Sequence, residues 1–199
     1  MQFSVGDKVV HPQYGPGKIV SAEHRELVKG LEHYYVIELL IDDSTLFIPM
    51  RKMDELGVRP VMSQAKLARV LSALRATPKR LSKDFKVRQA RVREKLATAR
   101  PIKVAEAIRD LIGRRQRSHL TKVDERLLKR GRELLATEMA LVNGIDVVNA
   151  HQTIDAALGG GKVREADAAE PVRVIGTSLK SEQQTWVQKL LRRVQAGEG

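Results

Sequence analysis

The chain has 199 residues and lacks cysteine, long apolar runs and the common catalytic motifs. Without cysteine it forms neither disulfides nor cysteine-type zinc fingers, and it has no thiol nucleophile. No apolar run approaches the roughly 18 residues that a membrane-spanning helix requires, and the first residues lack the order of a signal peptide. We therefore expect a cytoplasmic protein that does not bind a membrane.

The sequence also offers little for a cofactor, a metal ion or a small-molecule substrate. The nearest candidate for a phosphate-binding loop, GPGK at residues 15–18, has Pro12 and Ile19 where the Walker pattern requires glycine and a hydroxyl residue. The five histidines form no short-range ligand pair, and acidic pairs such as Asp42 and Asp43 lie beside turn residues. We therefore predict that the protein is not an enzyme and has no cofactor.

Positive charge is in excess, and it is unevenly distributed. Residues 1–60 contain 7 Lys and Arg against 9 Asp and Glu, residues 61–159 contain 22 against 10, and residues 160–199 contain 7 against 5. Within the middle segment, residues 75–103 hold 11 basic side chains but only two acidic ones. Such a local excess is typical of a surface that binds phosphates, although a solvated helical face has the same composition.

The first 60 residues have the pattern of a small β domain. Short runs such as KVVH, GKIV and HYYVIEL are rich in β-branched and aromatic residues, and turn residues separate them at 15–17, 29–30 and 42–44. Four or five short strands do not bury both faces of an open sheet. We therefore predict an SH3-like or Tudor-like β-barrel over residues 1–60, and an α+β protein overall.

Helical periodicity begins after Met62, where Leu67, Val70, Leu71 and Leu74 follow the spacing of one helix face. We predict about five helices in an all-α domain over residues 61–158. Beyond it, residues 159–199 are predicted to form a linker and an amphipathic C-terminal helix. The residues expected to begin the five helices are Ser63, Ser82, Pro101, Thr121 and Asp146.

A single aromatic residue, Phe85, lies within the basic stretch KRLSKDFKVRQARVREK at residues 79–95. Aromatic residues at helix starts are more often buried than exposed, so the residues alone favour a role for Phe85 in the core. The alternative is an exposed ring that contacts nucleic acid while the neighbouring cations bind phosphates.

Four longer segments of the chain resemble the CarD family of bacterial transcription regulators, whose first domain also occurs in transcription-repair coupling factor. FSVGDKVVHPQYGPGKIVSAE and LFIPMRKMDELGVRPV resemble the β domain of the family. REKLATARPIKVAEAIRDL and KVDERLLKRGRELLATEMAL resemble its helical domain. The likeness covers roughly residues 1–158, and its segments occur in the order and spacing of the family.

The resemblance implies a non-catalytic initiation regulator that associates with the nucleoid through RNA polymerase. In the family, the β domain binds the polymerase β subunit, and the helical domain contacts promoter DNA at the upstream fork of the bubble and stabilises the open complex. The tryptophan that the family wedges into the minor groove falls on Phe85, which lacks an indole N–H. The implied DNA-binding residues are Phe85, Lys83, Lys86, Arg88 and Arg91.

On the polymerase side, the resemblance implies that residues 45–49 form the sheet edge presented to the partner. Some relatives have arginine where this chain has Phe47, which favours an apolar contact here. Arg25 lies near another arginine that relatives use, although this chain has one extra residue between Gly15 and Gly30. The implied polymerase-binding residues are Arg25, Leu46, Phe47, Ile48 and Pro49.

Two other functions remain open at this point. The protein is alternatively a general nucleic-acid-binding or nucleoid protein, in which basic helices bind any duplex and the β domain is a structural cap. A third possibility is an interaction protein that recruits a repair translocase, since the β domain resembles that of the coupling factor. No ATPase motif accompanies it in this sequence.

Overall fold

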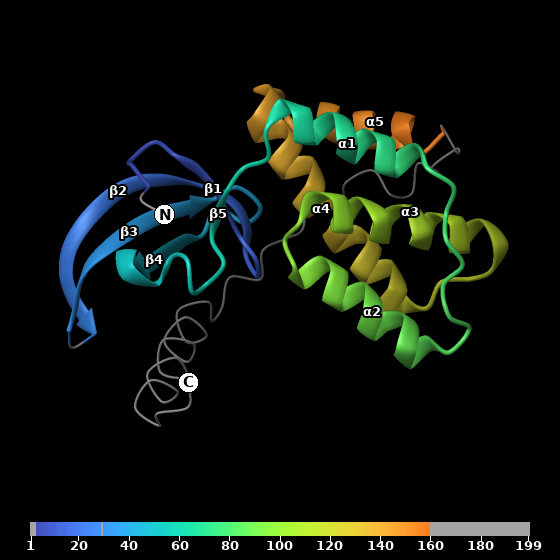
Figure 1. Cartoon of the computed structure of the whole chain (residues 1–199), viewed down its shortest axis with the longest axis horizontal. Helices are drawn as coiled ribbons and strands as arrows, with labels where there is room; N and C mark the ends of the chain where they lie inside the picture. The colour runs from blue at the N-terminus through green and yellow to red at the C-terminus, as the bar shows by residue number, and fades with distance from the viewer. Residues whose placement is uncertain (1–2, 29, 160–199) are drawn as a thin grey trace. The chain divides into compact units, whose positions relative to one another are not determined.

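A five-stranded antiparallel sheet followed by five α-helices makes up the computed structural model, which describes residues 3–28 and 30–159 (Figure 1). The predicted α+β class, with strands before helices, is therefore confirmed. All the described elements belong to one compact unit, Met1–Gly161. The linker and the C-terminal helix predicted for residues 159–199 lie, except for Gly159, outside the described residues.

The sheet is open at both edges. Its strands lie in the order β4-β3-β2-β1-β5, and every neighbouring pair is antiparallel. The predicted closed barrel is not confirmed, because β5 has two residues and its described partner is β1, while β4 pairs with β3. The bounds are β1 (Lys8–His11), β2 (Gly15–Val28), β3 (Leu31–Leu39), β4 (Thr45–Pro49) and β5 (Arg59–Pro60), with a 3₁₀ turn at Met50–Lys52.

Alternation along the strands produces one apolar face. In β4, Leu46 and Ile48 are buried, whereas Phe47 between them is exposed. Residues of one face on β1, β2, β3 and β4 meet in a single core cluster, which also includes residues before β1 and between β4 and β5. The buried members of this cluster are Phe3, Val9, Ile19, Tyr35, Ile37, Leu39, Leu46, Ile48, Met53 and Val58.

The five helices begin where the capping residues predict, with one exception. Ser63, Thr121 and Asp146 each accept a backbone N–H of the first helical turn through their side chains, and Pro101 is the first residue of its helix. Gly144, with φ of 64°, ends the fourth helix. The bounds are α1 (Gln64–Arg75), α2 (Phe85–Ala97), α3 (Pro101–Arg117), α4 (Lys122–Asn143) and α5 (Val147–Ala157).

The exception is α2, which is capped by Asp84 and not by Ser82. The Asp84 carboxylate accepts the backbone N–H groups of Lys86 and Val87, at 2.8 and 3.4 Å. Ser82 lies one step further out, where its Oγ accepts the N–H of Asp84 at 3.2 Å. The helix therefore starts with Phe85 as its first residue.

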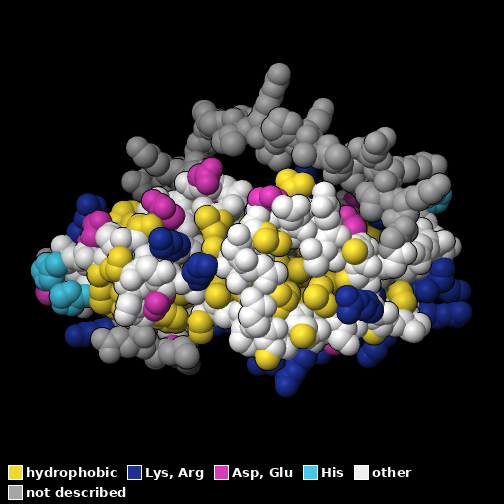
Figure 2. Space-filling model, turned by 90° about the horizontal axis from the view of Figure 1, so that it is seen from above, with side chains coloured by type: hydrophobic (Ala, Val, Ile, Leu, Met, Phe, Trp, Pro, Cys, Tyr) yellow, Lys and Arg dark blue, Asp and Glu magenta, His cyan; other side chains and the backbone are white. Residues whose placement is uncertain are grey.

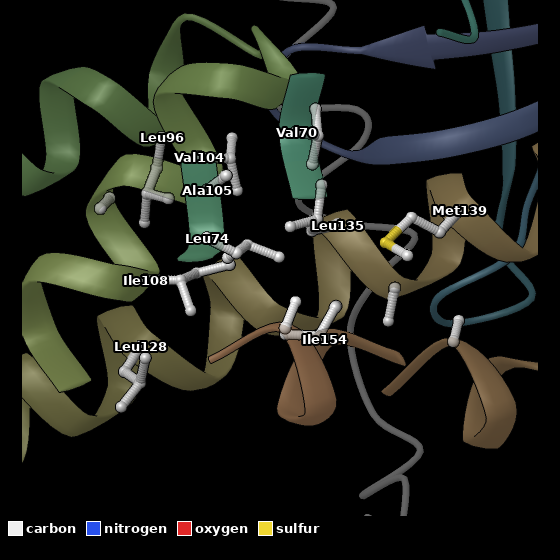
Figure 3. Packing of buried hydrophobic residues seen from close by; sticks show 14 of the residues in the cluster. Val70, Leu74, Leu96, Val104, Ala105, Ile108, Leu128, Leu135, Met139 and Ile154 are labelled. Atoms are coloured by element: carbon white, nitrogen blue, oxygen red, sulfur yellow. The ribbon is translucent and has the colours of Figure 1, made fainter. Parts of the chain in front are cut away.

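The helices share one core, to which all five contribute (Figure 3). Leu74 of α1, Leu96 of α2, Ile108 of α3 and Leu135 of α4 are among its buried residues. At Gly131 of α4, an added Cβ would lie 3.2 Å from Leu96 and 3.3 Å from Ile108. The absent side chain thus allows α4 to approach its neighbours closely. In the described part of the chain, no helix combines the length and apolarity that crossing a membrane requires.

A partly buried ion pair joins the end of the sheet to α4. Arg59 of β5 donates from Nη1 and Nη2 to the two carboxylate oxygens of Glu138, at 2.7 and 2.9 Å. The same guanidinium donates from Nε to the carbonyl of Ala99, and Glu138 also accepts the backbone N–H of Met62 at 2.8 Å. Glu138 is only 3% exposed, so this bidentate contact is shielded from water. It connects β5 to α4, and its further hydrogen bonds reach the segments that precede α1 and α3.

Candidate functional site

The first turn of α2 presents an aromatic ring to solvent. Phe85 is 52% exposed, and Val87 beside it is 39% exposed. Because Asp84 caps the helix at the preceding residue, the Phe85 side chain leaves the helix at its first turn, away from the apolar core. The reading of Phe85 as a core residue is therefore wrong, and the alternative of an exposed ring among cations agrees with the structure.

Arg88 does not belong to this exposed surface. Its side chain is 1% exposed, and its guanidinium donates from Nη2 and Nε to the Asp124 carboxylate at 2.8 and 3.2 Å. Burial alone would raise the pKa of Asp124, but hydrogen bonds from Arg88 and Thr121 bring it below its ordinary value. The expectation that Arg88 contacts DNA phosphates is thus corrected. Sequence spacing alone cannot reveal a partner 36 residues away.

The buried guanidinium instead holds the segment that precedes Phe85. Its Nη1 donates to the backbone carbonyls of Ser82 and Lys83 at 2.8 and 3.1 Å. On its other side, Asp124 completes a capping box with Thr121 at the start of α4. The Arg88 side chain therefore links residues 82–83 to the N-terminus of α4, and it restricts the conformations open to the ring-bearing turn.

Three of the predicted cations remain exposed at the surface of the segment that carries the ring. Lys83, Lys86 and Arg91 are exposed. Sequence reasoning missed Lys122, an exposed residue next to the Thr121 cap, because it lies outside the basic stretch 75–103. The residues on either side of it contact α2, because Thr121 accepts a hydrogen bond from Gln89 and Asp124 pairs with Arg88. Figure 2 shows Lys and Arg side chains in dark blue, most numerous toward the end of the view that the helices occupy in Figure 1.

The second surface is the edge of the sheet at β4. As expected, β4 has one strand neighbour, β3, in the described sheet and is therefore an edge strand. Phe47 is 37% exposed, while Leu46, Ile48 and Pro49 are buried. Of the four apolar residues predicted to bind polymerase, only Phe47 therefore presents its side chain. The other three position the strand.

Arg25 of β2 lies over the exposed Phe47. Its guanidinium carbon is 5.6 Å from the centre of the ring, and its Nε is 2.6 Å from the carboxylate of Glu23. A cation over an aromatic face is attracted by the negative charge of the ring face. The structure thus brings together two of the residues predicted from separate parts of the sequence, Arg25 and Phe47.

Comparisons with known proteins agree with the division into strands and helices. A family model described as the CarD-like/TRCF RID domain matches residues 3–62, and one described as the CarD C-terminal domain matches residues 69–155. YdeB of Bacillus subtilis (strain 168), described as a candidate transcription factor, is 27% identical over 143 residues. That match covers 72% of this chain and 94% of YdeB.

Proposed function

We propose, because this chain belongs to the CarD-like family, that it is a transcription initiation factor that binds RNA polymerase and promoter DNA together. The family matches support a role in transcription, and they favour a transcription factor over an enzyme. In the proposal, the edge of the sheet binds the polymerase β subunit. The first turn of α2 contacts the upstream fork of the melted bubble and prolongs the life of the open complex.

The observation that carries the proposal is the exposed Phe85 ring in a positioned, cation-rich turn. An apolar ring that inserts between base steps stabilises an unstacked or kinked duplex, and such wedges act from the minor groove. The backbone before Phe85 is held by the Arg88 guanidinium, and the helix start is held by the Asp84 cap. The ring is therefore presented without a large loss of conformational freedom on binding.

Cations around the ring supply the sequence-independent part of this contact. Lys83 and Lys86 are exposed within two residues of Phe85, Arg91 is exposed further along α2, and Lys122 is exposed at the start of α4. Each phosphate that such a side chain neutralises releases counterions, so the affinity depends on salt. In this arrangement the cations orient the protein on the backbone of the duplex, and Phe85 selects the place where the strands separate.

The sheet supplies the protein contact in this proposal. In the described sheet β4 is an edge strand, and the stacked pair of Arg25 and Phe47 adds an apolar and a cationic contact beside it. The Arg59–Glu138 pair then transmits the attachment to the helices, because it joins β5 directly to α4. A partner bound at the sheet thereby brings the α2 turn to DNA at high effective concentration.

The lifetime of open complexes after competitor challenge tests the DNA contact. With RNA polymerase and a promoter, we expect Phe85→Ala to shorten the lifetime by at least about fivefold, which corresponds to the low end of base–aromatic stacking energies. Phe85→Trp should retain or lengthen it. Val148→Ala is the matched control, since Val148 is an exposed apolar residue of α5 at 67% exposure. An unchanged lifetime in Phe85→Ala would contradict the proposal.

Co-purification of the polymerase β subunit with the full chain tests the protein contact. Phe47→Ser removes the exposed ring of β4, and Leu40→Ser is the matched control, because Leu40 is a 42% exposed residue in the turn after β3. We expect the first variant to lose the β subunit and the second to retain it. Equal recovery with both variants would remove Phe47 from the interface.

A second function, general duplex binding without polymerase, is favoured by the concentration of charge in the helices. Residues 61–159 contain 22 basic and 10 acidic residues. This alternative predicts tight, salt-dependent binding to bare duplex DNA and no preference for a fork. Titrating labelled duplex and fork DNA over a series of salt concentrations, with and without polymerase, separates the two functions.

A further inference from the structure

Two histidines and a glutamate meet near the turn of the β2–β3 hairpin. The histidines are nine residues apart in the sequence, so their spacing alone does not indicate this proximity. His24 of β2 and His33 of β3 are directly opposed cross-strand partners, and their rings are 4.9 Å apart. Glu32 approaches from the neighbouring position, with its carboxylate 3.3 Å from His24 Nε2. One possible ligand atom of each residue lies within 4.8 Å of the others.

An irregularity in the strand pairing explains how the glutamate joins the two rings. Adjacent residues of a regular strand point to opposite faces, so Glu32 and His33 would normally diverge. The register of β2 and β3 shifts between the pair His24 and His33 and the pair Val28 and Leu31, where β2 has extra residues. Such bulges twist a strand locally and re-aim its side chains. Where this pairing is irregular, the Glu32 carboxylate lies 3.3 Å from His24 Nε2.

This set of donors is one that divalent transition metals bind. Two imidazole nitrogens and one carboxylate oxygen form a common protein ligand set for zinc, with one further position left for water or another ligand. Bond lengths of about 2.0–2.2 Å require the donor atoms to be roughly 3.4 Å apart. His24 Nε2 and the Glu32 carboxylate already have this separation, at 3.3 Å, and the donor atoms of all three residues lie within 4.8 Å of one another. His24 and Glu32 have side chains that are 67% and 55% exposed, so rotation of their side chains can close this difference.

We propose that His24, Glu32 and His33 bind one Zn²⁺ ion. The site bridges the two strands at the end where their pairing is irregular, and a bound ion would link β2 to β3 there in addition to the backbone hydrogen bonds. Figure 2 shows histidine side chains in cyan together at the end of the view where Figure 1 has the β2–β3 turn. The site is separate from the α2 turn, and it depends on none of the contacts assigned to DNA or polymerase.

Calorimetric titration of the untagged full chain with ZnCl₂ tests the site. We expect one equivalent to bind the wild-type protein, and His24→Ala and His33→Ala each to weaken that binding by at least about tenfold. Glu32→Gln keeps the size of the side chain but removes its charge, so we expect a smaller, severalfold loss. The matched control is His119→Ala, because His119 is exposed and lies between α3 and α4.

Proton–nitrogen NMR spectra of the histidine rings provide a second readout that does not rely on heat. Zinc should shift the ring resonances of His24 and His33 and leave those of His11 and His151 in place. The three ligands are exposed, so we expect their variants to keep the far-ultraviolet circular dichroism of the wild type. The proposal is overturned if wild type binds no zinc at millimolar concentration, or if the double variant of both histidines binds it as tightly as wild type.

Discussion

The sheet and the helices of this chain place their charged groups differently. Among the described residues, the first 60 bury the imidazole of His11, and their charged side chains are exposed or, like Arg59, only partly buried. The helical part buries polar and charged side chains in its interior. These are Arg88, Gln89, Arg109, Asp110, Asp124, Thr137 and Glu138.

The buried charges of the helices occur in pairs, and the pairs hold backbone segments. Arg88 and Asp124 hold residues 82–83, and Arg59 and Glu138 hold the end of the sheet. Burying an ion pair adds little net stability, because desolvation offsets the attraction, but removing one partner is costly. We infer that the helical part uses charge to restrict its loops, whereas the β4 surface is positioned by strand pairing and an apolar core.

Removing one partner of a buried pair tests this difference between the sheet and the helices most directly. Arg88→Ala leaves the Asp124 carboxylate buried without its cation, and we expect the free energy of unfolding to fall by about 3–5 kcal/mol. Arg91→Ala is the matched control on the exposed side of α2, and it should change stability by less than about 0.5 kcal/mol. Urea denaturation measures both. Equal losses in the two variants would show that the buried pair of Arg88 and Asp124 is no more important to stability than an exposed arginine.

Mild acid should affect the sheet through His11. Its Nδ1 accepts the backbone N–H groups of Gln13 and Tyr14, at 3.1 and 3.3 Å, so the folded protein needs the neutral ring. Burial lowers the pKa of His11 to about 4 from 6.5. Between these values the unfolded chain binds a proton that the folded chain does not. The contribution of the neutral His11 ring to the free energy of unfolding is therefore complete above pH 6.5. It is lost as the pH falls toward 4, by about 3 kcal/mol in total.

Denaturation midpoints measured from pH 7 to pH 4 test this linkage. His11→Gln removes the titrating group, so its stability should fall less steeply over that window than the stability of the wild type. His119→Ala, which alters an exposed histidine, should follow the wild-type curve. If His11→Gln and wild type have parallel curves, the acid sensitivity arises elsewhere.

Features specified by short stretches of sequence were predicted well. Ser63, Thr121 and Asp146 cap their helices, and Pro101 begins another, because a cap acts on backbone groups within three residues. The edge position of β4 also agrees with prediction. The cap of α2 was predicted at Ser82 because serine and aspartate both satisfy the pattern, and the choice of Asp84 depends on where the chain leaves the preceding loop.

Features that depend on distant partners were not predicted. In the sequence, Arg88 does not differ from its exposed neighbours, because its partner Asp124 is distant along the chain. The proposed zinc ligands likewise come together only through the register of β2 and β3. The core-facing role of Leu46 and Ile48 follows from alternation, but the choice of face depends on β3 and on the loops that complete the sheet core. Charge and periodicity alone therefore locate the candidate surfaces without sorting exposed residues from supporting ones.

A smaller change at the α2 turn separates its helix cap from its ion pair. Asp84→Ala removes the acceptor for the N–H groups of Lys86 and Val87, and we expect a loss of about 1 kcal/mol of stability. Ser82→Ala removes only one hydrogen bond before the helix and should cost less. Thermal denaturation compares the two. A larger loss in Ser82→Ala would return the cap to the position expected from the sequence.

The smallest expected effect on stability is at the sheet surface, where Arg25 stacks on Phe47. Both side chains are partly exposed, so Arg25→Ala should lower the free energy of unfolding by no more than about 1 kcal/mol. If the pair contacts polymerase, the same variant should nevertheless weaken recovery of the β subunit, and Arg25→Lys should retain part of it, because lysine keeps the charge but not the planar group. A variant that unfolds easily would place Arg25 among the supporting residues of the sheet, and one that binds normally would restrict the polymerase contact to Phe47 and the strand edge.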